Sequence, residues 1–119
     1  MNFSNFKNKS VLITGHTGFK GLWLTIYLLS LGSKVVGISL QPTSYQKKVL
    51  KKLEKKKIKN YFFDITKHNK LKKTLIHNQP DYIFHLAAQS IVSESFKKPL
   101  ETWKTNVIGT GNLLDSLRF

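Results

Sequence analysis

The sequence predicts an α/β fold, in which a parallel β-sheet carries helices on both faces and is truncated after about four strands. Short, apolar, β-branched segments alternate with longer segments whose apolar residues recur every three or four positions. Turn-forming residues separate the two kinds of segment. The 119 residues, of which 40% are hydrophobic, suffice for the core of one domain but are few for a complete doubly wound sheet.

Strands and helices are expected to alternate along the chain. The expected strands are residues 10–14, 34–40, 58–63 and 82–87. The expected helices are residues 18–31, 45–57, 67–78 and 99 to the end of the chain, with a linker over residues 89–98. Because a helix follows each strand, we expect the strands to run parallel and to be joined by right-handed crossovers.

The helices are expected to present apolar stripes, with lysines on their outer faces. In residues 18–31 the stripe consists of Phe19, Leu22, Trp23, Ile26 and Leu29. Pro99 suits the first position of the last helix. The apolar residues of that helix keep a spacing of three to four and are Leu100, Trp103, Val107, Leu114 and Leu117.

Composition excludes several kinds of site. The chain has no cysteine, which excludes disulfides and thiolate metal sites and is compatible with a reducing cytoplasm. The N-terminus has no apolar core of signal-peptide length, and no apolar run is long enough to span a bilayer. We therefore expect a cytoplasmic protein without a metal and without membrane contact.

The net charge is +14, from 20 lysines and arginines against 6 acidic residues. Such a field attracts anionic ligands, including nucleotides and nucleic acid. Arg118 is the only arginine, whereas nucleic-acid readers rely on arginine for bidentate contacts. We expect the lysines to cover solvent-facing surfaces, and a basic nucleic-acid-binding module is an alternative reading of the chain.

Residues 11–21, VLITGHTGFKG, carry three glycines at intervals of three between the first strand and the first helix. Gly15 allows a tight turn, Gly18 lets a pyrophosphate approach the backbone, and Gly21 lets the helix pack against the strand. The helix N-terminus offers unpaired N–H groups and a partial positive charge to the phosphates, and Lys20 is a candidate for a second positive charge there. This pattern predicts a Rossmann-type dinucleotide-binding sheet.

The residues alone do not choose between NAD and NADP. A carboxylate near the end of the second strand normally holds the ribose hydroxyls of NAD. Here that strand ends in Ser39, Leu40 and Gln41, no acidic residue precedes Glu54, and no arginine stands ready for the phosphate of NADP. The hydroxyl groups available for a ribose are those of Ser39, Thr43 and Ser44.

Longer motifs give the sequence a family resemblance. They are Thr14-Gly15-His16-Thr17-Gly18-Phe19-Lys20-Gly21, Asp64-Ile65, His85-Leu86-Ala87-Ala88-Gln89 and Thr105-Asn106-Val107-x-Gly109-Thr110. Their order and spacing resemble the extended short-chain dehydrogenase/reductases of the NAD-dependent epimerase/dehydratase family, and most closely the CDP-glucose 4,6-dehydratases. The resemblance covers essentially the whole chain, which corresponds to the N-terminal third of such an enzyme.

The resemblance implies NAD as the cofactor, with NADP not excluded. The implied cofactor-binding residues are Gly15, His16, Thr17, Gly18, Phe19, Lys20, Gly21, Asp64, Ile65, Leu86, Ala87, Ala88, Gln89 and Asn106. Asp64 and Ile65 would lie against the adenine, and residues 86–89 would line the nicotinamide ribose and the substrate entrance. Asn106 would either brace the active site or simply tie down backbone. His85 is expected to be a packed strand residue rather than a catalyst.

The resemblance also implies a hydride relay on a sugar nucleotide, in which a Tyr-x-x-x-Lys pair supplies the base. None of the four tyrosines has a lysine four positions later, so we expect no catalytic residue in this chain. Residues 1–119 would be an incomplete NAD(P)-binding domain without the substrate domain, inactive alone, and would meet a nucleotide sugar only in a full-length enzyme. A fragment of another nucleotide-sugar epimerase or reductase is the enzymatic alternative.

Two features near the end of the chain bear on partners. After Gln89 the related sequences tend to read Pro-Leu-Val-Arg, whereas this chain reads Ser-Ile-Val-Ser over residues 90–93, which leaves open how a CDP-sugar would be held. The family often dimerises through a helix like the one at residues 99–118. The resemblance therefore implies a homodimer through that helix.

Overall fold

Four parallel strands form one sheet in the computed structural model, which describes residues 3–118. They are β1 (Ser10–Thr14), β2 (Lys34–Ser39), β3 (Ile58–Phe62) and β4 (Tyr82–His85), in the spatial order β3-β2-β1-β4. The four predicted strands are confirmed, and their ends differ from the prediction by at most two residues. Leu12 of β1 pairs with Val36 of β2 on one side and with Ile83 of β4 on the other, so β1 is a central strand.

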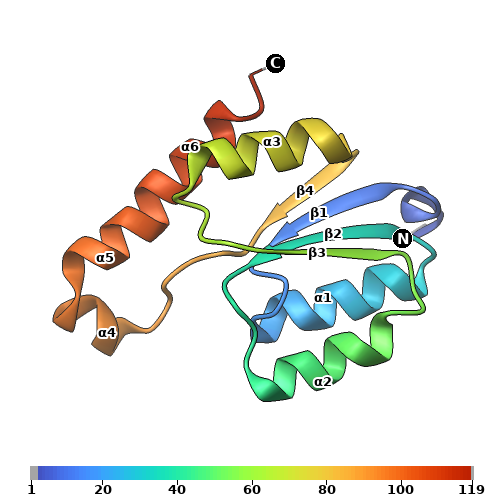
Figure 1. The fold of residues 1–119 in the computed structure, drawn as a ribbon, viewed down its shortest axis with the longest axis horizontal. Helices are drawn as coiled ribbons and strands as arrows, with labels where there is room; N and C mark the ends of the chain where they lie inside the picture. The colour runs from blue at the N-terminus through green and yellow to red at the C-terminus, as the bar shows by residue number, and fades with distance from the viewer. Residues whose placement is uncertain (1–2, 119) are drawn as a thin grey trace.

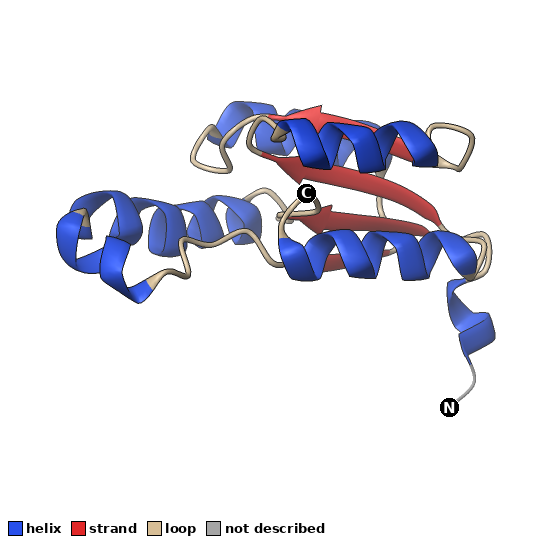
Figure 2. Cartoon of the chain, turned by 90° about the horizontal axis from the view of Figure 1, so that it is seen from below, coloured by secondary structure: helices blue, strands red, loops and turns tan. Residues whose placement is uncertain are grey.

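Helices cover both faces of the sheet (Figure 1). α1 (Phe19–Ser30) and α2 (Ser44–Leu53) lie on one face, and α3 (His68–Asn78) and α6 (Gly109–Asp115) lie on the other. Figure 2 shows the strands between the helical layers. The predicted fold class, a parallel sheet with helices on both faces, is confirmed.

The core has two halves, one on each face of the sheet. Side chains alternate along a strand, so Leu12 points to one face while Val11 and Ile13 point to the other. Leu12 packs with Leu71 and Leu75 of α3 and is fully buried. Val11 and Ile13 pack with residues of α1, among them Leu28. A strand buried on both faces explains why β1 is apolar from Val11 to Ile13.

The predicted apolar stripe of the first helix is wrong in part. Phe19 and Trp23 are exposed, with 82% and 64% of their surface accessible. Leu29 of the predicted stripe is buried, and the other buried residues of α1 are Gly21, Thr25 and Leu28. Because a Cβ atom on Gly21 would overlap the carbonyl group of Gly15, only a glycine permits this approach, and the glycine contact sets which side of α1 meets the sheet.

The predicted linker over residues 89–98 is wrong in part, because it contains a short helix. α4 (Val92–Lys97) is followed by α5 (Pro99–Trp103), by the π-helical segment η2 (Lys104–Ile108) and by α6. We call residues 92–115 the C-terminal arm. Its α4 and α5 project away from the sheet (Figure 1). The arm meets the body of the domain near α6, where Gly109 lies against Ile65 of the β3–α3 connection and Leu113 is buried.

Two smaller elements also differ from the prediction. A 3-10 helix, η1 (Phe3–Phe6), precedes β1 and had no counterpart in the predicted pattern. α2 ends at Leu53 rather than at residue 57, since the lysine-rich residues that follow form the turn into β3. Within residues 3–118, no helix combines the length and apolar character needed to cross a membrane, and no group of side chains suited to a metal ion is found.

Candidate functional site

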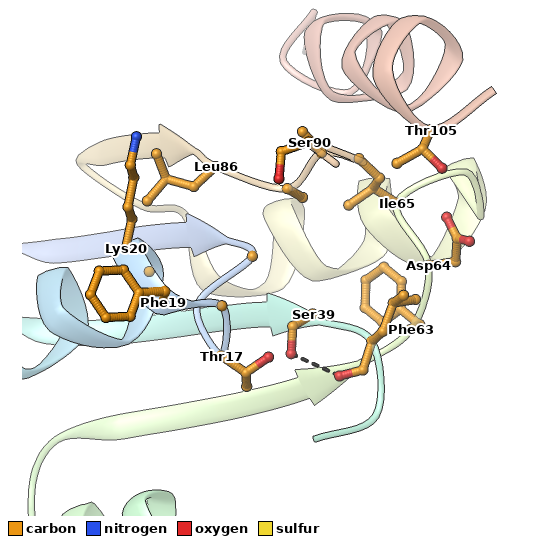
Figure 3. A pocket seen from close by; sticks show the side chains of 16 residues that line it. Thr17, Phe19, Lys20, Ser39, Phe63, Asp64, Ile65, Leu86, Ser90 and Thr105 are labelled. Carbon is orange, nitrogen blue, oxygen red and sulfur yellow. Dashed lines mark hydrogen bonds between the residues drawn. The ribbon is translucent and has the colours of Figure 1, made fainter. Parts of the chain in front are cut away.

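A cleft of about 550 Å³ opens at the edge of the sheet where the strands end (Figure 3). Its walls come from the segments that follow all four strands and from one residue of the arm. The lining residues are Gly15, Thr17, Gly18, Phe19, Lys20, Gly21, Ser39, Leu40, Phe63, Asp64, Ile65, Leu86, Ala87, Ala88, Ser90 and Thr105. A crevice beyond the carboxyl ends of the strands is what the sequence predicts for an open parallel sheet.

The cleft lies at the point where the strand order reverses. From β1 the chain proceeds to β2 and then β3 on one side of the sheet, and it returns to place β4 on the other side of β1. The loops after β1 and β4 therefore leave in opposite directions and open a space between them. This topological switch point is where open α/β sheets bind their ligands.

Gly15 makes the turn that leaves β1. Its φ angle is +76°, and a Cβ atom there would lie 2.8 Å from the backbone nitrogen of Ala87. Its own N–H donates to the carbonyl oxygen of Ile38 at 2.7 Å, which ties the turn to β2. Gly15 is thus required both by the backbone conformation and by the close passage of the loop after β4.

Gly18 is less crowded than Gly15, although an added Cβ atom would make one tight contact with the backbone. A Cβ atom at Gly18 would meet only the carbonyl oxygen of Gly15, at 3.3 Å. Its backbone is extended, which any residue can adopt. The open space therefore lies on the cleft side, where a side chain would obstruct a ligand approaching the backbone.

The N-terminus of α1 faces the cleft. Its N-cap is Gly18, which makes no side-chain cap, and Phe19, Lys20 and Gly21 of its first turn line the cleft. The N–H groups of a first turn have no partners within the helix, and the helix dipole makes this end positive. In the view of Figure 3, Lys20 extends toward the side of the cleft formed by Leu86. The arrangement suits an anion such as a pyrophosphate.

The side of the cleft next to β2 and β3 carries few charges. Ser39 lines it, and its hydroxyl group donates to the carbonyl oxygen of Leu40 at 2.9 Å. Asp64 follows β3, and one of its carboxylate oxygens accepts from the N–H of Thr66 at 2.8 Å. Among the residues that line the cleft, Asp64 is the one carboxylate and Lys20 the one cation.

The side of the cleft next to β4 is held by Thr14, the last residue of β1. The Thr14 hydroxyl oxygen accepts from the N–H groups of Leu86 and Ala87, both at 3.2 Å. The same oxygen lies 2.6 Å from Nδ1 of His85, and Nε2 of His85 lies 2.9 Å from the hydroxyl oxygen of Thr110 in α6. A buried side chain therefore fixes the backbone that forms this wall.

This network assigns the protons of His85. Thr14 Oγ1 already accepts from two N–H groups, so its hydroxyl proton goes to Nδ1, and Nε2 of His85 donates to Thr110. The Thr110 hydroxyl in turn donates to the carbonyl oxygen of Asn106 at 2.6 Å. Burial lowers the pKa of His85, which favours the neutral ring that this arrangement requires. His85 packs in the strand, as the sequence predicts.

Asn106, which lies 17 residues further along the chain, fixes the backbone at Gln89 after β4. Its side-chain oxygen accepts from the N–H of Gln89 at 2.8 Å, and its side-chain nitrogen donates to the carbonyl oxygen of Gln89 at 3.0 Å. Neither residue lines the cleft. Asn106 lies in η2, and π-helical turns often occur at functional sites. Of the two roles left open by the sequence, the structure shows the contact with backbone.

His16 also lies outside the cleft lining. Its side chain is fully buried, stacks on Phe62 and reaches Oδ1 of Asn60 in β3 with Nε2, at 2.9 Å. Burial lowers its pKa. Of the fourteen sequence-predicted site residues, the cleft lining includes all except His16, Gln89 and Asn106.

Four lining residues had not been singled out as site residues from the sequence, namely Leu40, Phe63, Ser90 and Thr105. Phe63 and Ser90 adjoin the predicted site residues Asp64 and Gln89, and Phe63 is the last residue of the predicted third strand, so a search of the residues at the ends of the predicted strands would have found Phe63. Thr105 comes from the arm, far along the chain, and no local pattern marks it. None of the four tyrosines lines the cleft.

Comparisons with known proteins agree with this geometry. A family model described as GDP-mannose 4,6 dehydratase matches residues 12–119. The chain is 36% identical over 117 residues to a CDP-glucose 4,6-dehydratase of Salmonella typhimurium, covering 95% of this chain and 32% of that protein. It is 36% identical to a GDP-mannose 4,6-dehydratase of Vibrio cholerae, with 94% and 32% covered, and 34% identical to a UDP-glucose 4-epimerase of Mycoplasma genitalium, with 90% and 31% covered.

Solved structures share the fold. The epimerase Mth375 of Methanothermobacter thermautotrophicus superposes with a TM-score of 0.85 at 28% identity, over 96% of this chain and 33% of that one. Pen of Bacillus thuringiensis superposes with a TM-score of 0.82 at 32% identity, over 93% and 34%. The chain spans about a third of the length of the curated relatives it matches.

Proposed function

Because the chain belongs to the GDP-mannose 4,6 dehydratase family, we propose that its 119 residues form the NAD-binding part of a sugar-nucleotide 4,6-dehydratase of the CDP-glucose type. One observation carries the proposal: the glycine turn after β1, the free end of α1 and the loop after β4 meet in one cleft at the switch point of the sheet. A dinucleotide needs a site of this kind, in which an anion-binding site for the pyrophosphate lies between sites for the two nucleosides.

The cleft residues fit a dinucleotide in their chemistry. The pyrophosphate would lie against Gly18 and the N-terminus of α1, where a side chain would fill the space. The adenosine would lie on the side of Ser39 and of Phe63 to Ile65, and the nicotinamide ribose on the side of Leu86 to Ala88. His16, Gln89 and Asn106 would act by holding backbone in place, since their side chains contact neighbouring segments.

The charge pattern supports NAD rather than NADP. The phosphate on the adenosine ribose of NADP needs a cationic partner, whereas NAD carries a neutral hydroxyl there. Among the described lining residues the one cation is Lys20, which in the view of Figure 3 extends toward Leu86 and away from Ser39. Ser39 offers a hydroxyl group and no charge.

NAD supplies a hydride acceptor and donor, and the residues of this chain supply its binding and orientation. The acid–base pair that the family uses, Tyr-x-x-x-Lys, does not occur in the 119 residues. We therefore propose that this chain binds the cofactor and does not dehydrate a sugar nucleotide alone. Action on a sugar nucleotide would need residues beyond these 119.

An epimerase of the same superfamily is the second candidate. The identity of 34% to a UDP-glucose 4-epimerase and the superposition on the epimerase Mth375 favour it. Both candidates require the same NAD cleft, and they differ in residues that the chain does not contain. The match to the CDP-glucose 4,6-dehydratase covers 117 residues and the match to the epimerase covers 107, which favours the dehydratase.

The arm supports a homodimer. Leu100, Trp103 and Leu114 lie at helical spacing along it and are each more than half exposed. We propose that this apolar stripe packs against the same stripe of a second copy.

A titration followed by NADH fluorescence tests the proposed cofactor site. Wild type is expected to bind NADH, and Gly18→Asp is expected to abolish binding, because it places a carboxylate in the cradle for the phosphates. Circular dichroism of both proteins is the control for folding, since a Cβ atom at Gly18 makes one tight contact, 3.3 Å from the carbonyl oxygen of Gly15, on a backbone that suits any residue. A folded wild type that does not bind NADH would overturn the proposal.

A further inference from the structure

We infer that Gln46, in the first turn of α2, is a positioning residue for the dinucleotide: it holds the peptide between Thr17 and Gly18, whose N–H closes the glycine turn, and so keeps the turn in the shape that lets the phosphates reach the N-terminus of α1. This inference rests on the proposed dinucleotide site. It concerns a residue that lies outside the cleft lining and outside the glycine motif.

Gln46 uses both ends of its amide group. Its Oε1 accepts from the N–H of Thr43 at 2.8 Å, and its Nε2 donates to the carbonyl oxygen of Thr17 at 2.7 Å. Because Thr43 N–H can only donate and the Thr17 carbonyl can only accept, the amide has one orientation that satisfies both partners. The side chain therefore links the start of α2 to the glycine turn.

The contact with Thr43 alone does not require glutamine. Thr43 is the N-cap of α2, and its hydroxyl oxygen accepts from the N–H of Gln46 at 3.3 Å to complete a capping box. Glutamate and glutamine serve equally at this position of a capping box, because only an acceptor is needed there. The contact with Thr17 is the one that needs a donor, and of the two residues only glutamine provides it.

The contact with Thr17 acts on the neighbouring glycine. The carbonyl group of Thr17 and the N–H of Gly18 belong to the same planar peptide unit, so fixing one fixes the direction of the other. The Gly18 N–H donates to the carbonyl oxygen of Gly15 at 3.0 Å, which closes the turn. Without the Gln46 contact, this peptide unit would lose its one side-chain tether from α2.

His16, the residue of the turn before Thr17, is held by a contact with β3. His16 occupies the space above Gly37, where a Cβ atom would collide with its ring, and contacts Asn60. Residues 16 and 17 are thus tied to different elements, one by a fully buried ring and one by a partly exposed amide. Gln46 is the tether that can be altered without opening the core.

The test compares three variants that separate the contact from the cap and from charge. Gln46→Glu keeps the acceptor for Thr43 N–H and removes the donor to Thr17. Thr43→Ala weakens the cap and keeps the contact; the sequence made the Thr43 hydroxyl a candidate for the ribose, but Thr43 does not line the cleft. Tyr45→Glu places a carboxylate one residue away on an exposed position, without touching the glycine turn. The NADH dissociation constant and the thermal midpoint are measured for each, together with the amide resonance of Gly18 in a ¹⁵N-labelled chain.

Gln46→Glu is expected to raise the NADH dissociation constant about five- to tenfold, since one hydrogen bond is lost and a carboxylate faces a carbonyl oxygen. It should also shift the Gly18 amide resonance. Thr43→Ala should lower the thermal midpoint and leave the dissociation constant within about twofold of wild type, as should Tyr45→Glu. Gln46→Met, which has no charge, replaces Gln46→Glu if the latter does not fold.

The inference is overturned if Gln46→Glu binds NADH as wild type does, or if Thr43→Ala or Tyr45→Glu weakens binding to the same extent. The first result would show that the contact between Gln46 and Thr17 does not affect NADH binding. Weaker binding by Thr43→Ala would assign the loss of affinity to the cap of α2, and weaker binding by Tyr45→Glu would assign it to the added charge. A folded wild type without NADH affinity would instead overturn the proposed function, and with it the role of Gln46.

Discussion

The β1–α1–β2 unit and the C-terminal arm use apolar residues in opposite ways. In residues 10–39 the apolar side chains of both strands are almost completely buried, and Leu28 of α1 is 1% exposed. In the arm, Leu100, Trp103 and Leu114 are exposed to 83%, 65% and 62%. Phe19 and Trp23 of α1 are exposed, but the strands of the first unit are covered on both faces. The arm contributes mainly Gly109 and Leu113 to the core and presents most of its other apolar residues outward.

The two regions serve the cleft differently as a result. The first unit lines the cleft directly, because the packing of β1 against α1 and β2 positions Gly15, Gly18 and the N-terminus of α1. The arm acts on the cleft through Thr105 and through the contact of Asn106 with Gln89. Substitutions at matched residues in the two regions should therefore have different consequences.

Glycine substitutions give the largest expected contrast. Gly21→Val should cost more than about 4 kcal/mol and unfold much of the chain, because even a Cβ atom overlaps the backbone of Gly15. Gly111→Ala in α6 has no atom within 4 Å of the added Cβ and should stabilise the chain by about 0.5–1 kcal/mol. Urea unfolding measures both, and a stable Gly21→Val would contradict the close packing of α1.

Leucine truncations give the next largest contrast. Leu28→Ala should lower the free energy of unfolding by about 3 kcal/mol at every protein concentration, since it opens a cavity in a closed core. Leu114→Ala should change it by less than about 0.5 kcal/mol in dilute solution.

The same pair tests the homodimer. At higher protein concentration the cost of Leu114→Ala should grow, because a partner would then cover that side chain. Light scattering on wild type and Leu114→Ala gives the matching masses. A monomeric wild type at all concentrations would leave the arm without the proposed partner.

A smaller effect is expected from pH. Burial lowers the pKa values of His16 and His85 below their ordinary value of 6.5, so the folded chain binds fewer protons than the unfolded chain once the pH falls toward and below 6.5. Stability is therefore full above that pH and decreases on acidification, by up to about 1.4 kcal/mol per pH unit for each histidine, until its lowered pKa is reached. Urea unfolding at pH 7.5 and 5.5 checks the sign. The arm contains no histidine and should not contribute directly.

The sheet and the cradle could be predicted because their signals are local. β1 is a short apolar run, and the three glycines have a fixed spacing that only a strand–turn–helix unit explains. The side of α1 that meets the sheet could not be predicted by apolar spacing, because the close contact between Gly21 and Gly15 outweighs the size of Phe19 and Trp23.

Other parts of the site depend on tertiary contacts that no local pattern reveals. His16 sits in the glycine motif and yet points away from the cleft, into the space that Gly37 leaves on β2. The π-helical segment η2 and the placement of Thr105 arise where the arm approaches the β3–α3 connection, and no periodicity marks them. Gln46 matches an ordinary capping box, so its second contact is visible only in the structure.

Hydrogen–deuterium exchange with and without NADH tests the central claim most directly, because it reports on both regions at once. We expect NADH to slow exchange in the segments that line the cleft, residues 15–21, 63–65 and 86–90, and to leave residues 92–103 of the arm unchanged. Protection confined to the arm, or a folded chain with no protection at residues 15–21, would contradict the account.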